Sequence, residues 1–423
     1  MSLSVGIDLG TSACRVAVID KSGQVLHLSR SELAEPVSDG PRCEQSPCDW
    51  WHACQSALTD ALKQVDKSLV SRIAVDGTSS TLLLCDEHGQ ETGPALMYRD
   101  QRAHAQADQL ANLAPADAAV HSASSSLAKL LWFKDQGQLK KGLIALHQAD
   151  WICGQLRGQF DTTDENNALK LGYDAIHRCW PDWLRSCDLT KDCLPVVVPA
   201  GQCLGKIAPD IADQFGLSPN CEIIAGTTDS TATFIASGAK MVGDALTVLG
   251  STLVIKILSD KPIFAPNMGI YSHRLGDHWL VGGASNTGGA VLKQFFTTEQ
   301  LKTLSQRIKP DTLIGLDYMP LPGVGERFPV NDPDLQPCFE PRPANDVEFL
   351  QALLESIARI EQQGYEALVE LGAPKPVSIR SSGGGAQNHA WQLLREGMLG
   401  TPLLKSAHEE AAVGAAMLAA SNK

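Results

Sequence analysis

The chain has 423 residues, more than the roughly 250 to 300 that one hydrophobic core usually serves, so we expect two domains. Its 48 acidic and 35 basic residues give a formal net charge of -13, which argues against a nucleic-acid partner. The 12 cysteines form no CxxC pair of the kind found in zinc ribbons, and no stretch approaches the ~20 apolar residues of a membrane span. We therefore expect a cytoplasmic protein without a membrane segment.

The first predicted elements are strands joined by tight turns, over residues 4–30. Asp8 lies at the end of the first strand and is followed closely by Gly10, Thr11 and Ser12. A carboxylate beside a turn rich in NH and OH groups suits the phosphates of a metal nucleotide. The alternative is an ordinary β-hairpin with a turn-capping aspartate, and the pattern by itself leaves both open.

A predicted helix from 47 to about 67 and a buried strand over 72–76 follow, and their alternation is typical of an α/β sheet. The strand runs into a small polar loop that contains Ser79. Further on, Asp100 lies in a predicted loop, where an aspartate can accept hydrogen bonds from sugar hydroxyls. Arg102 follows two positions later, and a surface ion pair is the competing interpretation of Asp100.

The second half repeats the hairpin pattern, because a strand over 244–249 runs into Gly250, Ser251 and Thr252 and then into a strand over 253–258. This echo is compatible with an internal duplication but is too short to require one. The turn lacks the lysine of the Walker motif, so any phosphate site here is built on a hairpin.

Asp229 follows a strand and precedes a predicted helix, at a place suited to a general base that takes a proton from a sugar hydroxyl. An N-cap aspartate is the equal alternative. Near the end, the glycines around Gly384 and Gly385 allow close backbone approach to a ligand, and Gln387 and Asn388 precede another helix. A flexible turn is the alternative there.

In this order, the elements resemble the FGGY carbohydrate kinases of the actin, Hsp70 and sugar-kinase superfamily over nearly the whole chain. The motifs that carry the resemblance are VGIDLGTS at 5–12, EQSPCDWW at 44–51, the KLLW helix at 129–132 and GGGAQN at 383–388 followed by Trp391. The resemblance implies an α/β fold of two actin-like (ribonuclease H-like) domains with an interdomain catalytic cleft. The expected domains are 1–223 and 224–407, with a closing helix over 408–421 that completes the first.

The resemblance also implies a cytoplasmic enzyme that uses ATP and Mg²⁺ to phosphorylate the terminal hydroxyl of a ketopentose, D-ribulose first and D-xylulose second. It makes Asp229 the catalytic base and Asp8 a metal ligand. The expected partners are the sugar and ATP, for a monomer or homodimer. Sugar contacts are expected from Asp8, Ser79, Asp100 and Asp229, and nucleotide contacts from Gly10, Thr11, Ser12, Gly250, Ser251, Thr252, Gly384, Gly385, Gln387 and Asn388.

Two motifs in the second half of the chain depart from the family's pattern. Gly-Thr-Thr-Asp at 226–229 stands where the family has a sequence closer to GGGDN, and Gly-Ser-Thr at 250–252 replaces the order GTS. The second departure leaves open which hydroxyl meets the γ-phosphate. The rival functions are an actin- or Hsp70-like ATPase and a catalytically silent sugar sensor.

Overall fold

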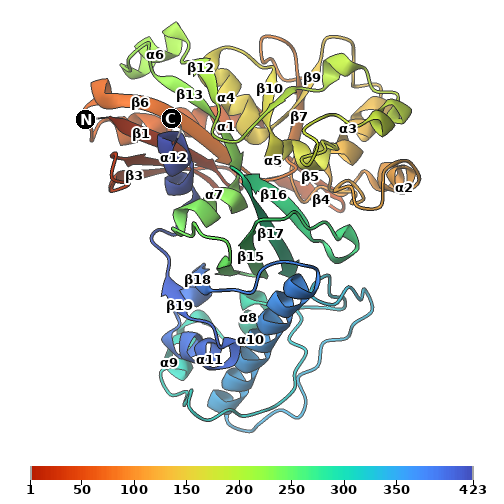
Figure 1. Ribbon diagram of the computed structural model, residues 1–423, viewed down its shortest axis with the longest axis vertical. Coiled ribbons are helices and arrows are strands. Elements are labelled where there is room, and N and C mark those ends of the chain that lie inside the picture. The colour runs from red at the N-terminus through yellow and green to blue at the C-terminus, as the bar shows by residue number, and fades with distance from the viewer. Residues whose placement is uncertain (1, 422–423) are drawn as a thin grey trace. The chain divides into compact units, whose positions relative to one another are not determined.

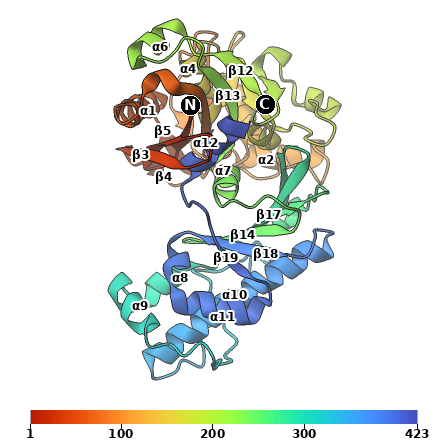
Figure 2. The same cartoon turned by 60° about the vertical axis from the view of Figure 1, so that its left-hand side comes forward.

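The structure is a computed structural model that describes residues 2–421, and it divides into two compact units. The units are shown in Figures 1 and 2 and are described one at a time. The first unit contains the chain up to Ala236, the short segment His273–Gly276 and the chain from Glu410 onward; the second contains Ser237–Ser272 and Asp277–Glu409.

The division falls after Ala236, beyond the expected boundary at 223. The reason lies in the sheet of the first unit, where β13 (Glu222–Thr228) pairs in parallel with β6 (Val70–Gly77). Helix α7 (Asp229–Ala236) follows β13 directly. As a result, Asp229 belongs to the first unit together with Asp8.

The first unit is built on a six-stranded sheet in the order β12-β13-β6-β1-β2-β3. Strands β1, β2 and β3 form an antiparallel meander, whereas β6 and β13 extend the sheet in parallel beside β1. The remaining strands of this sheet are β1 (Leu3–Leu9), β2 (Ala13–Ile19), β3 (Val25–Glu32) and β12 (Cys203–Lys206).

Helix α12 (Ala411–Ser421) lies against β1 and α7 in Figures 1 and 2, three residues later than the expected start at 408. Two glycines make this approach possible. A Cβ at Gly6 would collide with the backbone of Ala412, and one at Gly414 would collide with the carbonyl of Ala232 on α7. Helix α12 therefore packs closely against the sheet of the first unit.

The first unit also contains a five-stranded sheet in the order β4-β5-β8-β7-β9 and the pair β10-β11. Their strands are β4 (Val37–Asp39), β5 (Arg42–Gln45), β7 (Leu82–Cys85), β8 (Ala95–Leu96), β9 (Ile144–His147), β10 (Thr162–Asp164) and β11 (Val196–Val198). The helices are α1 (Pro47–Leu62), α2 (His104–Leu113), α3 (Ser126–Asp135), α4 (Gln148–Arg157), α5 (Glu165–Ala168) and α6 (Pro209–Phe215).

The second unit has a six-stranded sheet in the order β16-β17-β15-β14-β18-β19. The strands of this sheet are β14 (Asp244–Leu249), β15 (Leu253–Ser259), β16 (Tyr271–Leu275), β17 (His278–Ser285), β18 (Ser378–Ser382) and β19 (Leu403–Lys405). Residues 273–275 of β16 are grouped with the first unit. Its helices are α8 (Gly289–Phe295), α9 (Thr298–Ser305), α10 (Asp346–Glu370) and α11 (His389–Leu399).

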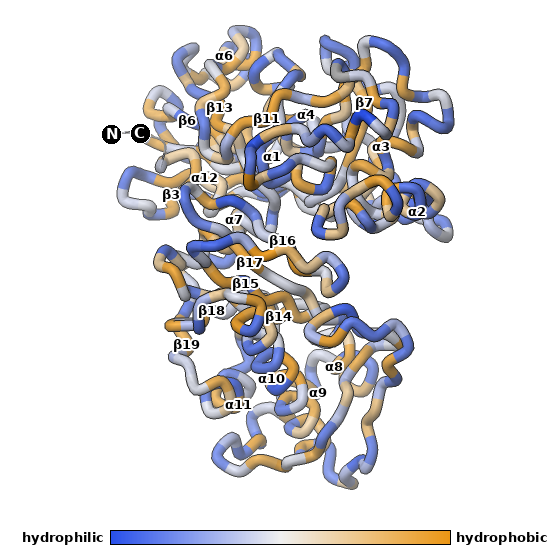
Figure 3. Tube along the Cα trace, turned by 45° about the vertical axis from the view of Figure 1, so that its right-hand side comes forward, coloured by the Kyte–Doolittle hydropathy of each residue, from blue (hydrophilic) through white to orange (hydrophobic). Residues whose placement is uncertain are grey.

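The two sheets share one plan. Strands β14, β15 and β17 form an antiparallel meander, and β18 and β19 extend it in parallel, as β6 and β13 do in the first unit. The hairpin echo in the sequence thus corresponds to equivalent strands. Each unit has its own hydrophobic core, and Figure 3 shows hydrophobic residues along buried strands such as β13 and β15. Over residues 2–421, no helix is both long and apolar enough for a membrane crossing.

Candidate active site

Three aspartates lie at the carboxyl ends of three neighbouring strands in the first unit. Asp8 on β1 and Asp76 on β6 are direct partners in the parallel ladder. Asp229 comes immediately after β13, the next strand beyond β6. Because paired residues of adjacent strands project to the same face of a sheet, this order brings three carboxylates together. Sequence analysis proposed Asp8 and Asp229 and did not propose Asp76.

Burial and the charges of neighbouring carboxylates raise the pKa values of Asp8 and Asp76. Burial raises the pKa of Asp8 to about 6, the nearby charge of Asp229 adds to the increase, and the Arg15 guanidinium opposes it. Burial also raises the pKa of Asp76 well above its ordinary value, with Asp8 and Asp229 acting in the same direction. Perturbed pKa values of this kind are concentrated at functional sites.

Asp76 is fully buried, and among the described residues no protein N–H or hydroxyl donates a hydrogen bond to either of its carboxylate oxygens. Its neighbour Asp8 offers the remaining possibility, because a protonated Asp76 can donate to the Asp8 carboxylate. A buried carboxyl without a donor is costly to the fold, which indicates a role other than stability.

Arg15 lies across the β1–β2 hairpin from Asp8, and the two residues are register partners. Its Nη1 atom donates to Oδ2 of Asp8 at 3.2 Å, and its Nε atom lies 3.5 Å from Oε2 of Glu410. Arg15 was not predicted as a site residue. The register of a β-hairpin with its turn at 10–12 would have identified it as the cross-strand partner of Asp8.

The first turn is fixed by the backbone. Gly10 donates its N–H to the carbonyl of Ala13 at 3.1 Å, and the amide of Gln45 donates to the carbonyl of Thr11 at 3.0 Å. The carbonyl of Ser12 accepts from the N–H of Leu33 at 2.8 Å. Gly10, Thr11 and Ser12 are half-exposed, so this rigid turn can still present polar groups to a ligand.

Asp229 is the first residue of α7 and is half-exposed, which makes its carboxylate accessible. Its Oδ1 atom accepts the N–H of Ser230 at 2.6 Å. The N-terminus of a helix stabilises a negative charge, because the unpaired N–H groups of the first turn point toward it. The carboxylate can therefore accept a hydrogen bond from the hydroxyl of a ligand and can then take the proton of that hydroxyl.

Ser79 and Asp100 have different surroundings. Ser79 is half-buried in the loop after β6. Asp100 is completely buried, and its carboxylate accepts the N–H of Cys43 at 2.6 Å and the guanidinium of Arg102 at 2.7 Å. Arg102 also pairs with Glu44 at 2.8 Å. This geometry favours the ion-pair interpretation of Asp100, in a buried form, over the expected sugar contact.

In the second unit, the turn Gly250–Thr252 is held by the start of α8. The N–H groups of Gly289 and Ala290 donate to the carbonyls of Gly250 and Ser251 at 2.8 and 3.1 Å. A Cβ at Gly289 would lie 2.8 Å from the carbonyl oxygen of Gly250, so the contact requires glycine. Ser251 is exposed at the tip of this turn.

The glycine-rich segment lies beside the same turn. Gly383 has a φ of +83°, and a Cβ there would lie 2.8 Å from the carbonyl oxygen of Leu249, the last residue of β14. Gly384 and Gly385 open a short 3-10 helix over Gly384–Gln387. Gly384 is exposed, and a Cβ there would meet no atom within 4 Å, so this position has room for a ligand.

Gln387 and Asn388 were also expected at the nucleotide, but their side chains have structural partners. Gln387 donates to Glu409 at 3.0 Å. Asn388 caps α11 by accepting the N–H of Trp391 at 3.1 Å, and it donates to Ser305 at 2.9 Å. These contacts give both residues a local structural role.

A buried ion pair links β14 and β18, the strands that lead into the turn at 250–252 and the glycine-rich segment at 383–385. Arg395 on α11 donates to the two carboxylate oxygens of Glu361 at 2.6 and 2.7 Å, and both side chains are fully buried. Arg395 also donates to Ser381 on β18 at 2.8 Å, while Glu361 accepts from Thr247 on β14 at 2.6 Å. The pair therefore links the two strands that end at Gly250 and Gly383.

A magnesium site made only of protein ligands has no support here. In the described part of the chain, no three His, Cys, Asp or Glu side chains are grouped so that they could hold a metal ion. Mg²⁺ is commonly held by one or two carboxylates together with substrate phosphates, and Asp8 suits that arrangement. The donor set therefore fits a metal nucleotide better than a resident metal.

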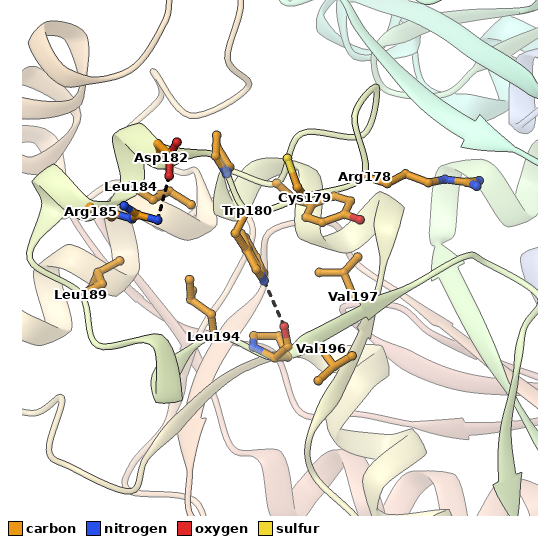
Figure 4. Close-up of a pocket in the computed structure, with 13 residues that line it drawn as sticks. Arg178, Cys179, Trp180, Asp182, Leu184, Arg185, Leu189, Leu194, Val196 and Val197 are labelled. Carbon is orange, nitrogen blue, oxygen red and sulfur yellow. Dashed lines mark hydrogen bonds and ion pairs between the residues drawn. The ribbon is translucent and has the colours of Figure 1, made fainter.

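A cavity of about 460 Å³ lies elsewhere in the first unit (Figure 4). Trp180, Leu184 and Leu194 line it, and the indole N–H of Trp180 donates to the carbonyl of Pro195 at 3.3 Å. None of the predicted site residues lines this cavity. The titratable chemistry is at Asp8, Asp76 and Asp229, so we place the candidate site there.

Comparison with protein-family models gives two matches. Residues 3–236 match the N-terminal domain of the FGGY family of carbohydrate kinases, and residues 245–422 match its C-terminal domain. The chain belongs to the FGGY family of carbohydrate kinases. The predicted family and the two-domain α/β fold are confirmed, and this FGGY kinase is a sugar kinase.

Similar proteins agree with the family assignment. The kinase is 26% identical to a xylulose kinase from Bacillus subtilis, over 99% of this chain and 88% of the relative, and 22% identical to a gluconokinase from the same organism, over 99% and 87%. A ligand-bound xylulose kinase from Lactobacillus acidophilus has the same fold, with a TM-score of 0.88, 19% identity and coverage of 99% and 89%. Plasmodium falciparum glycerol kinase with ADP gives a TM-score of 0.85, with 16% identity and coverage of 99% and 89%.

Proposed function

We propose that this kinase transfers the γ-phosphate of ATP to the terminal hydroxyl of a ketopentose. The observation that carries the proposal is the group of three carboxylates, Asp8, Asp76 and Asp229, at the ends of adjacent strands in a chain of the FGGY family. Asp229 is half-exposed at a helix start, as a general base for a small substrate needs to be.

In the proposed reaction, the sugar hydroxyl hydrogen-bonds to Asp229. The hydroxyl oxygen attacks the γ-phosphorus, the bond from that phosphorus to the bridging oxygen of ADP breaks, and Asp229 takes the hydroxyl proton. Ser79 and Asp8 orient the sugar. Asp100 acts indirectly, because its buried ion pair with Arg102 holds the neighbouring backbone.

The nucleotide is proposed to use the backbone and hydroxyl groups of the two turns, Gly10–Ser12 and Gly250–Thr252. Its base would lie against Gly384 and Gly385, where the exposed side of Gly384 leaves space. When bound, Mg²⁺ would neutralise phosphate charge, with Asp8 as its protein ligand.

The names of the relatives bear on the sugar. Proteins similar to this chain from Bacillus subtilis, Escherichia coli and Staphylococcus xylosus are named xylulose kinases, and two others are named gluconokinases. These names support D-xylulose at least as well as D-ribulose, the sugar first expected from sequence motifs. We therefore propose a pentulose kinase, with D-xylulose and D-ribulose as its two candidate substrates.

The test is a comparison of kcat/KM for D-xylulose, D-ribulose, L-xylulose, L-ribulose, D-gluconate and glycerol with Mg·ATP. A pentulose with a kcat/KM at least tenfold above those of gluconate and glycerol supports the proposal and identifies the sugar. A preference for gluconate or glycerol would contradict the substrate class while leaving the kinase assignment intact.

A further inference from the structure

Lys129, on α3, is completely buried and has no part in the reaction proposed above. Its neighbours along the helix, Leu127, Leu130 and Leu131, belong to hydrophobic clusters. Burial lowers the pKa of Lys129 to about 7. An amine enclosed in this way is costly unless its N–H groups are satisfied, so its hydrogen bonds show what it contributes.

Among the described residues, Lys129 donates two hydrogen bonds, both to backbone carbonyls. Its Nζ atom lies 2.8 Å from the carbonyl oxygen of Ser80 and 2.7 Å from that of Met97. Ser80 belongs to the loop after β6, and Met97 follows β8. The Lys129 side chain thus links the loop after β6 to the segment after β8.

The Ser80 bond holds an unfavourable backbone conformation. Ser80 has a φ of +69°, in the left-handed region that residues other than glycine seldom adopt. Its own hydroxyl is buried and has no hydrogen-bond partner among the described residues, so it cannot compensate. Such a conformation persists when its surroundings enforce it, and strain of this kind is concentrated at ligand sites.

Further hydrogen bonds hold the loop at Thr78 and Thr81, on either side of Ser79 and Ser80. The N–H and hydroxyl of Thr78 donate to the side-chain carbonyl of Gln148 at 3.0 and 2.8 Å. The hydroxyl of Thr81 accepts the N–H of Tyr98 at 3.0 Å, which gives a second link to the segment after β8. Ser79, the half-buried residue between these anchors, is thereby presented in one conformation.

We propose that Lys129 is a positioning residue that fixes the Ser79 loop through the carbonyls of Ser80 and Met97 and so sets the affinity for the sugar. This inference rests on the proposed function, in which Ser79 contacts the sugar. Lys129 is completely buried and is not one of the residues proposed to contact the sugar or the nucleotide. Its loss therefore affects the sugar KM selectively and leaves the ATP KM in place, a pattern that simple loss of folded protein does not produce.

The experiment compares wild type, Lys129→Met and Lys134→Met with D-xylulose and D-ribulose. Lys134 is a matched control, because it lies on the same helix and its Nζ atom donates to a carbonyl, that of Cys187 at 2.9 Å, outside the loop. We expect Lys129→Met to raise the KM for the preferred pentulose at least tenfold, with the ATP KM within twofold of wild type. Lys134→Met should change neither.

An unchanged sugar KM in Lys129→Met, whatever its melting temperature, would overturn the inference. If that variant does not fold, Lys129→Gln takes its place, since the shorter amide keeps a buried donor but cannot reach both carbonyls. A three- to tenfold rise in the sugar KM would then support the inference, and no rise would overturn it. Wild type that is silent with both pentuloses would instead contradict the proposed function.

Discussion

Asp8 and Asp76 occupy directly paired positions on the parallel strands β1 and β6, and both carboxyls are buried. Asp8 has a basic partner in Arg15, whereas Asp76 has no protein donor among the described residues. A fold selected for stability alone would not place two buried acids side by side. Their arrangement is explained by a ligand that brings positive charge or hydroxyl donors to this place.

Replacing Asp229 by Asn should remove the acceptor for the sugar proton. We expect kcat to fall by about 10²- to 10⁴-fold, the range that a general base usually contributes. Binding of ATP, measured by calorimetry, should stay within a few-fold of wild type because the proposed nucleotide contacts lie elsewhere. An Asp229→Asn variant with full kcat would show that another group takes the proton.

Replacing Asp76 by Asn should stabilise the protein in the absence of Mg²⁺ and nucleotide. The amide keeps the shape of the side chain, cannot ionise beside Asp8 and Asp229, and can donate to Asp8. We expect a gain of about 1 kcal/mol or more at pH 7.5, seen as a higher melting temperature.

The contrasting variant is Asp100→Asn, also at a fully buried aspartate of the first unit. Its carboxylate is satisfied by Cys43 and Arg102, so the substitution should destabilise by roughly 3 to 5 kcal/mol, as breaking a buried ion pair does. If both variants moved the melting temperature in the same direction, the distinction between the two aspartates would be wrong.

Gly384→Ala should weaken ATP binding without harming the fold. The added methyl group meets no protein atom within 4 Å, but it would occupy the space proposed for the nucleotide base. We expect the ATP KM to rise several-fold at an unchanged melting temperature. Gly397→Ala on α11, where a Cβ is equally unopposed, is the control; equal ATP KM values in the two variants would place the base elsewhere.

The lowered pKa of Lys129 predicts a pH dependence of stability. The folded form loses the Lys129 proton at about pH 7, while the unfolded chain keeps it to about 10.5. Between these values the unfolded state binds more protons, so the contribution to stability rises with pH, by up to about 1.4 kcal/mol per pH unit. It is lost as the pH falls through 7.

Burial is the main cause of this shift, with Asp100 opposing it and Lys170 adding to it. The melting-temperature difference between wild type and Lys129→Met should therefore widen from pH 7 to pH 9. The corresponding difference for Lys134→Met should stay constant. A constant difference for Lys129→Met as well would show that the buried amine stays charged throughout.

The sequence predicted the strand-and-turn elements well because tight turns and apolar strands are local features. Asp8, Gly10 and Asp229 could be proposed from such features together with the family motifs. Asp76 escaped notice because its significance depends on pairing with Asp8 across the sheet, a contact between residues distant in the chain. Lys129 was recognised only as part of a helix motif, since its bonds to Ser80 and Met97 come from tertiary packing.

Tertiary packing also explains where individual expectations differ from the structure. The segment after 223 groups with the first unit because β13 joins its sheet through β6, which no local pattern reveals. Asp100 looked like a loop residue that could face a sugar. In the structure it is buried, and its carboxylate accepts hydrogen bonds from Cys43 and Arg102. Cys43 is distant from Asp100 in the sequence, so only the folded chain places the two side by side.

The measurement that tests the central claim most directly is ADP release from Mg·ATP by the wild-type protein, with and without D-xylulose or D-ribulose. We predict that ADP release is close to background without sugar and rises at least a hundredfold with one of the pentuloses, with one sugar phosphate formed per ADP. Hydrolysis of ATP at the same rate with and without sugar, or no turnover with any sugar, would contradict the assignment of Asp229 and its neighbours as a sugar-phosphorylating site.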